Sequence, residues 1–282
     1  MRNLKRKIKN KTKLIIAIIW SLFSYSGRGR LTVPILCYHS INDSANYEAD
    51  ALSPEYFKDH LQYLIENYTP ISLEKAVAYI DGRCPEIKNP VVITFDDGYK
   101  DNYDIAFPLL KKFGVPATVF VVTGFINENL KLINDSDFDA LTWDQIREMD
   151  RHDLVDIGAH TDTHPILSEI KDAEVVKEIV ESKKILEYEL SRKVGLFAYP
   201  NGQLSDIPVS AIDTISREQF LCACSTVWRT SHAANEKLLL GRVMISGTDT
   251  LKIFKYKVSG SFDFLHHVQK IKFYIYKVFA QH

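Results

Sequence analysis

Three observations on the sequence predict an α/β protein built on a parallel sheet of about seven strands. From residue 33 to residue 245, short apolar runs rich in β-branched residues alternate with segments of helical spacing. Ser53 and Ser72 stand where helix N-caps are expected, and Gly114 follows a helical segment. No Pro-, Ser- or Gly-rich linker interrupts this stretch, which indicates one domain. Because strands that alternate with helices form βαβ units, a barrel and an open doubly wound sheet both fit.

The predicted strands are short and apolar, as expected of strands that are buried on both faces. They lie at residues 33–38, 91–95, 117–122, 154–158, 195–199, 220–224 and 239–245. The predicted helices carry apolar residues three and four positions apart. They lie at residues 54–68, 73–80, 104–113, 142–151, 171–192 and 207–217. The polar connection at residues 127–140 is long, so it is either a lid or binding loop or a surface insertion.

The composition is that of an ordinary globular protein, with 46% apolar and 25% charged residues. The net charge of −1 argues against a nucleic-acid partner. This charge is unevenly distributed, because residues 1–30 hold nine Lys and Arg and no acid, whereas residues 31–262 hold 23 Lys and Arg against 35 Asp and Glu. The four cysteines are interpreted as buried small hydrophobes, and their C-x-C pair is a weak metal signal. They are Cys37, Cys84, Cys222 and Cys224.

The basic N-terminal segment, residues 1–30, admits three interpretations. Seven Lys and Arg fall within residues 1–13, and an apolar run at residues 14–23 follows. Ten residues of helix span about 15 Å, half of a bilayer's hydrocarbon core. The segment is therefore a secretory signal, a helix that lies in the membrane interface, or a helix buried against the body. Cations before the run favour a cytoplasmic N-terminus, but the side of the membrane on which the body lies stays open.

The C-terminal segment, residues 251–282, is predicted to be a basic amphipathic helical segment that follows a catalytic domain at residues 31–250. Its apolar residues recur at spacings of four and three, which places them on one helix face. They are Phe264, Val268, Ile271, Ile275 and Val278, and the polar residues off this stripe are His266, His267, Lys270 and Lys277. Such a helix binds a membrane surface or packs on the body. The two ends together predict a membrane-associated protein of the cell envelope.

Polar residues follow three of the predicted strands, and parallel strands present their carboxyl ends at one edge. Asp96 and Asp97 follow residues 91–95. Adjacent carboxylates repel, so a metal ion that one of them binds would explain the pair; an Asp-Gly turn is the alternative.

His160 and His164 follow residues 154–158 at a spacing typical of zinc ligands. Because Pro165 disfavours a helix there, we expect a loop, which brings both imidazoles to one ion or exposes them at the surface.

Pro200, Asn201 and Gly202 follow the strand predicted at residues 195–199 and form a turn whose backbone N–H groups are suited to an oxyanion. The ordered motifs TFDDGY, HTDTHP and FAYPNG resemble those of the polysaccharide deacetylases, the NodB-homology carbohydrate esterases. PILCYHSI at residues 34–41 and IAFPLLKKFGVPATVFVV at residues 105–122 extend the resemblance, which covers about residues 33–245. It implies a distorted (β/α) barrel.

The resemblance also implies a role for each matching residue. Asp96 matches the family's catalytic base, and Asp97, His160 and His164 match its metal ligands, with Zn²⁺ as the expected ion. The backbone N–H of Asn201 matches the family's oxyanion donor. These roles imply hydrolysis of an N-acetyl amide by metal-activated water.

Three departures from the family pattern affect the expected machinery. Where many members have an arginine that orients the base, this sequence has Ala198. Arg242, in LLLGRVMI, is the candidate replacement, with a surface salt bridge as the alternative. The later Leu-x-His motif that carries the family's general acid is missing, as is the Asp/Trp motif. His39, at the end of the first strand, is the remaining candidate acid, or else a core histidine.

The function expected from these motifs is metal-dependent removal of N-acetyl groups from an aminosugar, with release of acetate. The basic, apolar ends favour an envelope polysaccharide or a lipid-linked glycan as the substrate. One alternative is a deformylase or deacylase of another aminosugar lipid. A further alternative is a catalytically weak glycan-binding module, although such a module needs no base beside the ligands.

Overall fold

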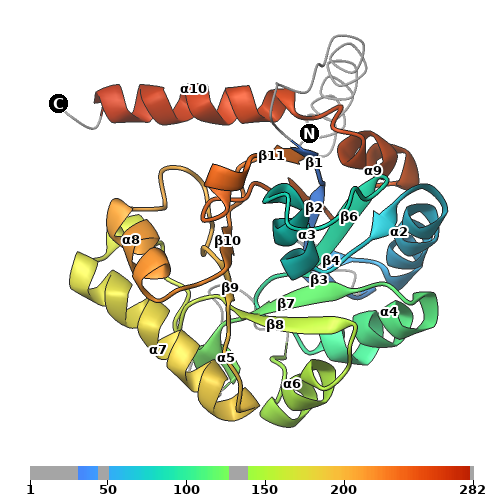
Figure 1. Ribbon diagram of the computed structural model, residues 1–282, viewed down its shortest axis with the longest axis horizontal. Coiled ribbons are helices and arrows are strands. Elements are labelled where there is room, and N and C mark those ends of the chain that lie inside the picture. The colour runs from blue at the N-terminus through green and yellow to red at the C-terminus, as the bar shows by residue number, and fades with distance from the viewer. Residues whose placement is uncertain (1–30, 44–50, 127–138, 280–282) are drawn as a thin grey trace, which may run out of the picture.

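A curled sheet of parallel strands forms the centre of the molecule, and helices surround it (Figure 1). The computed structural model describes residues 31–43, 51–126 and 139–279. Seven strands of the sheet follow the order β10-β9-β8-β7-β6-β2-β12, and all their pairings are parallel. They are β2 (Ile35–Tyr38), β6 (Pro90–Phe95), β7 (Ala117–Val121), β8 (Val155–Ala159), β9 (Leu196–Ala198), β10 (Cys222–Cys224) and β12 (Val243–Met244). The α/β class and the distorted barrel of about seven strands are confirmed.

The last strand segment joins the two edges of this sheet. Leu240 forms a parallel bridge to Cys224 of β10, and Val243 pairs with Leu36 of β2. The strand predicted at residues 239–245 is therefore divided between two partners, and only β12 is regular. Gly241 lies at the crossing, where a Cβ atom would come within 2.5 Å of the carbonyl oxygen of Val227. The close backbone approach thus requires a glycine.

The helices begin and end close to the predicted positions. Ser53 and Ser72 cap α2 and α3 through their side chains, and Gly114 ends α4 in the left-handed conformation at φ 65°. The helix predicted at residues 104–113 differs, because its first turn is π-helical at Asn102–Ala106. The helices are α2 (Pro54–Asn67), α3 (Leu73–Ile80), α4 (Phe107–Phe113), α5 (Thr123–Ile126), α6 (Trp143–Asp150), α7 (Asp172–Leu190), α8 (Val209–Arg217), α9 (Leu251–Val258) and α10 (Phe264–Phe279).

Short strands and turns complete the described structure. Except for β5, which pairs with the start of β6, these elements lie outside the central sheet. The short elements are β1 (Leu31–Thr32), β3 (Ser40–Ile41), β4 (Ala51–Leu52), β5 (Thr69–Pro70), β11 (Ser231–His232) and the 3₁₀ turns Leu167–Glu169 and Ala234–Glu236. The interpretations of residues 1–30 and of most of the 127–140 connection fall outside the described residues.

The barrel interior has an apolar middle beneath the polar end at which the strands finish. Ile35, Val92 and Phe120 from neighbouring strands meet there in one buried cluster. Cys222 and Cys224 of β10 belong to this cluster, as expected of buried hydrophobes, whereas Cys84 is only partly buried. Helix α3 packs four of its side chains into the same cluster at the end where the strands begin. Polar groups at the opposite end, where the strands finish, are thereby isolated from solvent below.

Helix α10 lies along the outside of the body, at the top of Figure 1. Among the residues that the structure describes, we find no helix with the length and apolar character that a bilayer crossing requires.

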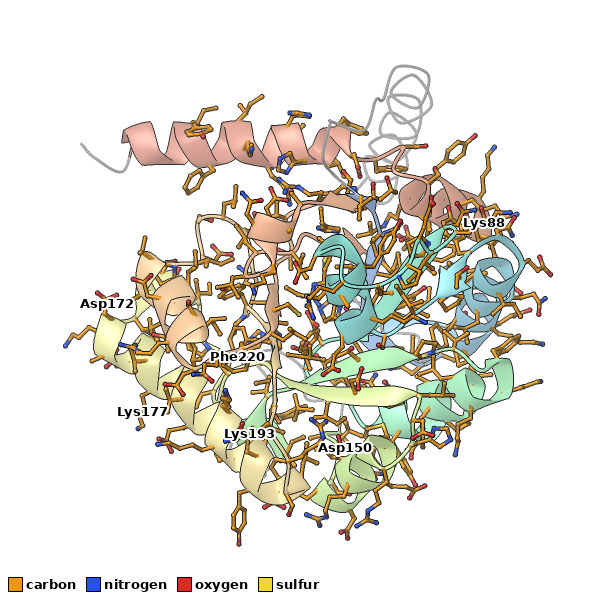
Figure 2. All side chains as sticks on the ribbon, in the orientation of Figure 1. Lys88, Asp150, Asp172, Lys177, Lys193 and Phe220 are labelled. Atoms are coloured by element: carbon orange, nitrogen blue, oxygen red, sulfur yellow. The ribbon has the colours of Figure 1, made fainter. Side chains whose placement is uncertain are left out.

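Asp156 on β8 gives the stability of the fold a predicted pH dependence. Burial raises the pKa of this carboxyl to about 6, Glu74 and Asp150 add to the rise, and Arg192 opposes it. Of these residues, Asp150 is labelled in Figure 2. Between about pH 4 and pH 6 the folded state therefore holds the proton more tightly than the unfolded chain. The free energy of unfolding consequently falls as the pH rises through this window.

Asp156→Asn removes the buried charge and should stabilise the protein at pH 8 by about 1–2 kcal/mol. Two pKa units correspond to about 3 kcal/mol, and partial exposure reduces this figure. At pH 4 the gain should disappear, which urea unfolding at both pH values would measure. Asp213→Asn, an exposed position on α8, is the control and should change neither value. An equal gain at pH 4 and pH 8 would contradict this account of Asp156.

Candidate active site

The carboxyl ends of β6, β8 and β9 bring the predicted site residues together. Asp96 and Asp97 directly follow β6, and His160 directly follows β8. His160 is 2% exposed, and its Nδ1–H donates a 2.7 Å hydrogen bond to the carbonyl oxygen of Ala198 at the end of β9. This bond fixes the tautomer, so the Nε2 lone pair is available to a ligand.

Asp97, His160 and His164 form a three-membered group that fits a divalent metal ion. The Oδ1 atom of Asp97 lies 3.4 Å from Nε2 of His160 and 3.5 Å from Nε2 of His164. A tetrahedral ion with bonds of about 2.0–2.1 Å would hold its ligand atoms about 3.3–3.4 Å apart. Two imidazole nitrogens and one carboxylate oxygen are a typical catalytic zinc set that leaves a position for water. The predicted ligands therefore converge, and their donor chemistry fits the expected ion.

The pKa values of the two histidines are shifted in opposite directions. Burial lowers the pKa of His160, but its hydrogen bond to Asp97 and the charges of Asp96 and Asp97 raise it above the usual value. Burial and the neighbouring His160 lower the pKa of His164 to about 4. The two carboxylates thus favour a positive charge on this group, and His164 is unprotonated at neutral pH. A divalent ion would supply such a charge.

Three of the candidate site residues have left-handed backbone conformations. Asp97, His164 and Asn201 have φ values of 76°, 58° and 57°. Such conformations are uncommon outside glycine and cost about 1–3 kcal/mol where the side chain is poorly suited. They lie in the segments that follow β6, β8 and β9. Pro165 leads to the expected loop, since residues 160–166 are not helical.

Arg242 pairs with Asp96 inside the barrel. Its Nη1 and Nη2 atoms donate to the two carboxylate oxygens of Asp96 at 2.6 Å each. Arg242 is fully buried, so the surface salt bridge considered as the alternative is wrong. Its other donors reach Thr94 Oγ1 at 3.1 Å and the carbonyl oxygen of Ser225 at 3.0 Å, and its guanidinium lies 5.7 Å from the ring centroid of Phe120. The structure thus places a cation against the candidate base although Ala198 carries none.

This ion pair sets the charge of Asp96. Burial raises the pKa of the Asp96 carboxyl, but Arg242 and then His160 outweigh it and hold that pKa well below the usual range. The carboxylate is therefore ionised at neutral pH. Its Oδ2 atom lies 4.0 Å from Nε2 of His160, so the charged group borders the candidate metal ligands.

His39 lies beside Asp96 at the end of β2. One ring nitrogen of His39, the Cys37 thiol and a carboxylate oxygen of Asp96 are all within 4.8 Å of one another. The Nδ1 atom of His39 is buried and has no hydrogen-bond partner within the described part of the chain. Asn102 holds the backbone here by donating a 2.8 Å hydrogen bond to the His39 carbonyl oxygen. The structure thus brings His39 into the site, and its role as the general acid stays a prediction.

Hydrogen bonds at the side-chain amide and at the backbone carbonyl hold Asn201 in the loop after β9. Its side-chain amide donates a 3.0 Å hydrogen bond to Asp206, and its carbonyl oxygen accepts one of 2.6 Å from Thr226. For its backbone N–H, no acceptor is found among the described residues. This N–H is thereby available to an incoming oxygen, as the oxyanion prediction requires.

Sequence reasoning missed two carboxylates that position the site loops. Glu178 on α7 accepts hydrogen bonds from the backbone N–H groups of Asp162 and Thr163, at 3.0 and 2.8 Å. Asp101 accepts from Ser40 Oγ at 2.5 Å and from the backbone N–H of Ile41 at 3.1 Å. Glu178 is one of many acids on a charged helix, so no local pattern distinguishes it. For Asp101, the sequence did offer a signal, because this residue lies two positions after the motif TFDDGY at residues 94–99.

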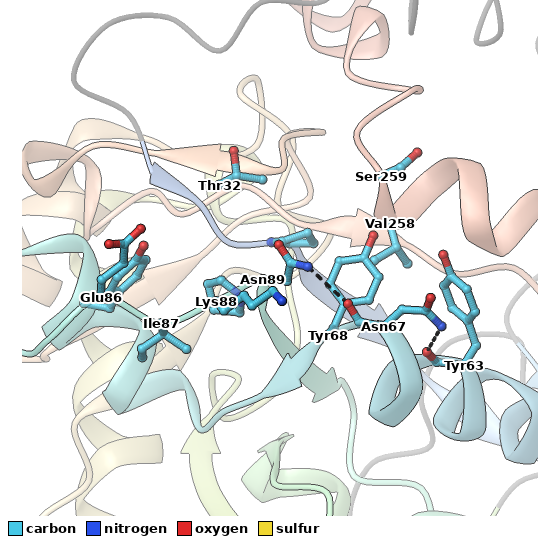
Figure 3. Close-up of a pocket in the computed structure, with 13 residues that line it drawn as sticks. Thr32, Tyr63, Asn67, Tyr68, Glu86, Ile87, Lys88, Asn89, Val258 and Ser259 are labelled. Carbon is cyan, nitrogen blue, oxygen red and sulfur yellow. Dashed lines mark hydrogen bonds between the residues drawn. The ribbon is translucent and has the colours of Figure 1, made fainter.

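A separate cavity of about 830 Å³ opens at the other end of the barrel (Figure 3). It is lined in part by Tyr63, Tyr68 and Asn89, and by the prolines that precede or begin β2 and β6. Because these strands begin there, the cavity lies away from the carboxyl ends that carry Asp97 and His160. It takes no part in the site described here.

The sequence model of the polysaccharide deacetylase family matches residues 84–215. This range contains Asp96, Asp97, His160, His164 and Asn201, whose geometry agrees with a deacetylase site. Over this range the chain is similar to the polysaccharide deacetylases.

Two curated relatives show the same similarity. YxkH of Bacillus subtilis is 29% identical over 182 residues, which are 64% of this chain and 61% of YxkH. The poly-β-1,6-N-acetyl-D-glucosamine N-deacetylase of Staphylococcus aureus is 27% identical over 180 residues, 61% of this chain and 60% of that enzyme. The chain therefore matches about 60% of the length of these curated relatives.

The solved structure of the Streptococcus pyogenes deacetylase PplD, in complex with acetate, has a similar fold. It is 26% identical, and the match covers 81% of this chain and 98% of PplD with a TM-score of 0.70. This agreement extends beyond the matched range of the family sequence model.

Removing Arg242 should destabilise the fold through the charge that it leaves behind. Arg242→Met leaves the buried Asp96 carboxylate without its cation. The free energy of unfolding, measured with urea at pH 7, should therefore fall by about 3–5 kcal/mol. Asp96→Asn combined with Arg242→Met should restore much of this loss, because no unpaired charge remains. Arg83→Met, which removes an exposed pair with Asp81, should cost less than about 1 kcal/mol. A double variant no more stable than Arg242→Met would contradict the explanation.

Glu178 should matter for metal affinity although it contacts no ligand atom. Glu178→Gln replaces an acceptor oxygen and loosens the loop between His160 and His164, so Zn²⁺ affinity should fall about tenfold or more. Calorimetric titration of the metal-free protein measures this change. Glu181→Gln on the same helix, whose partner is the surface residue Lys184, is the control. Equal Zn²⁺ affinities of the two variants would show that Glu178 does not position the metal ligands.

Proposed function

We propose that this protein hydrolyses N-acetyl groups from aminosugars of a polysaccharide or lipid-linked glycan and releases acetate. The observation that supports it most is the convergence of Asp97, His160 and His164 beside an ionised Asp96. A base next to a three-ligand metal group is what amide hydrolysis by activated water needs. The match of residues 84–215 to the polysaccharide deacetylase family supports an acylated aminosugar as the substrate.

The metal group would consist of Asp97, His160 and His164, with a divalent ion that polarises the amide carbonyl and lowers the pKa of water. His160 is oriented for this task by its hydrogen bond to Ala198, and His164 by the loop that Glu178 holds. The carboxylates of Asp96 and Asp97 favour a positive charge at this group, which a divalent ion would supply.

Asp96 would take the proton of the attacking water. Arg242 keeps the carboxylate ionised and fixes its plane through two hydrogen bonds, so the base is oriented before substrate arrives. The backbone N–H of Asn201 would donate to the oxygen of the amide as its negative charge develops. His39 would then give a proton to the departing amine, which becomes the free amino group of the sugar.

The names of two relatives support the substrate class. The Staphylococcus aureus relative is named for poly-β-1,6-N-acetyl-D-glucosamine, and the PplD structure holds acetate, the product that N-deacetylation releases. We therefore favour an N-acetylglucosamine polymer of the cell envelope over other acylated sugars. A formylated or otherwise acylated aminosugar lipid is the second candidate, since the ligand group and base would serve any small amide.

Acetate release from β-1,6-linked N-acetylglucosamine oligomers, and from lipid-linked N-acetyl sugars, tests the proposal. Activity should disappear with a chelator and return with Zn²⁺. Asp97→Ala and His160→Ala should lose bound metal, and Asp96→Asn should keep it while kcat falls at least about 100-fold. His39→Gln should lower kcat by a similar factor with metal retained, and Asp213→Asn should change nothing.

Three outcomes would contradict parts of this account. Metal binding that survives both ligand substitutions would overturn the site assignment. Bound metal without turnover of any acylated sugar would favour the glycan-binding module. Full activity of His39→Gln would remove His39 from the reaction and leave the acid to another group.

A further inference from the structure

Helix α10 attaches to the body through one polar face. The side-chain oxygen of Gln269 accepts a 2.7 Å hydrogen bond from the backbone N–H of Trp228, and its amide donates one of 3.2 Å to the carbonyl oxygen of Thr226. His266 lies 3.0 Å from Arg229, nitrogen to nitrogen. These contacts involve the residues that follow β10, and they fix which face of α10 points inward.

The apolar stripe of the helix therefore points outward over most of its length. Phe264 at its start is buried, but Val268, Ile271 and Ile275 are 41%, 59% and 52% exposed. Tyr274 beside them is 62% exposed. The alternative that this stripe packs on the body thus fails for the three residues after Phe264. A contiguous exposed apolar stripe on a well-formed helix indicates an interaction surface.

Cations border the stripe on both sides. Lys270 and Lys272 are exposed and adjoin Ile271 in the sequence, so they project about 100° to either side of it. Neither forms an ion pair with any residue of the described part of the chain. Residues 264–282 contain three Lys and no Asp or Glu, so nothing acidic on the helix neutralises them.

We propose that α10 binds the surface of an anionic lipid bilayer, with Val268, Ile271 and Ile275 in the acyl-chain boundary and Lys270 and Lys272 at the headgroups. A helix of 16 residues is about 24 Å long, too short for a crossing, and its apolar face suits a position parallel to the membrane. The inference does not depend on the reaction proposed above.

Charge distinguishes this partner from a second copy of the chain. Two α10 helices that faced each other would bring four exposed lysines together without an acid, and like charges repel. An anionic bilayer instead attracts each lysine and also buries the apolar stripe. Residues 1–13 add seven more Lys and Arg to the same chain, which supports the same partner.

Vesicle flotation of the full chain tests the proposal. The protein should float with phosphatidylcholine vesicles that contain a quarter phosphatidylglycerol, bind at least tenfold more weakly to phosphatidylcholine alone, and lose binding as salt screens the headgroups. Ile271→Asp with Ile275→Asp should reduce binding to the anionic vesicles at least tenfold. Tyr188→Asp with Val209→Asp is the matched control, because both side chains are exposed apolar residues of other helices.

A second pair of variants isolates the charge. Lys270→Glu with Lys272→Glu should weaken binding to the anionic vesicles at least fivefold, whereas Lys177→Glu, on the outer face of α7 (Figure 2), should not. Acetate release from a soluble oligomer should persist in all these variants, which separates failure of the docking surface from failure of the proposed reaction.

Unchanged vesicle binding by Ile271→Asp with Ile275→Asp would overturn the proposal, as would equal effects of the matched controls. So would a lipid-free dimer, detected by light scattering, that these substitutions convert to a monomer. That result would assign the stripe to a contact between copies of the chain.

Discussion

The buried ion pair between Asp96 and Arg242 is the interaction on which the rest of the site depends. Two charges taken out of water are costly unless their hydrogen-bonding groups are satisfied. Here both carboxylate oxygens face the guanidinium, and the remaining donors of Arg242 reach Thr94 and Ser225. Arg242 lies in the segment from Leu240 to Met244, which joins the two edges of the sheet. The segment that closes the barrel therefore also supplies the cation that pairs with the buried Asp96.

The division of the barrel interior explains how such a charged group is tolerated. Apolar side chains such as Val92 and Phe120 fill the middle, and α3 seals the end where the strands begin. Charged groups are confined to the other end, where they meet both solvent and one another. In that position Asp96 is kept ionised by Arg242, whereas Asp97 is free to share a cation with His160 and His164. Two adjacent carboxylates thus acquire different electrostatic surroundings.

The charge asymmetry of the chain has a structural counterpart. The acidic body contains the barrel, and α10 presents cations with an apolar stripe on its outer surface. A helix that packs by a polar face and exposes its apolar one is unfavourable in water, because apolar surface stays hydrated. The proposed bilayer contact would relieve this cost and would hold the barrel near an envelope glycan.

The sequence by itself determined the parallel α/β class and the order of the main elements, and its motifs, through their resemblance to a known family, named the candidate metal ligands. Each of these depends on local pattern: the apolar strands, the caps at Ser53 and Ser72, and motifs placed directly after strands. The position of Arg242 was a hypothesis until tertiary structure joined residues 146 positions apart in the chain. Glu178 gave no signal, since its role depends on which loop lies against α7. The outward face of α10 was likewise open, because helical spacing defines a stripe but not the side on which the body lies.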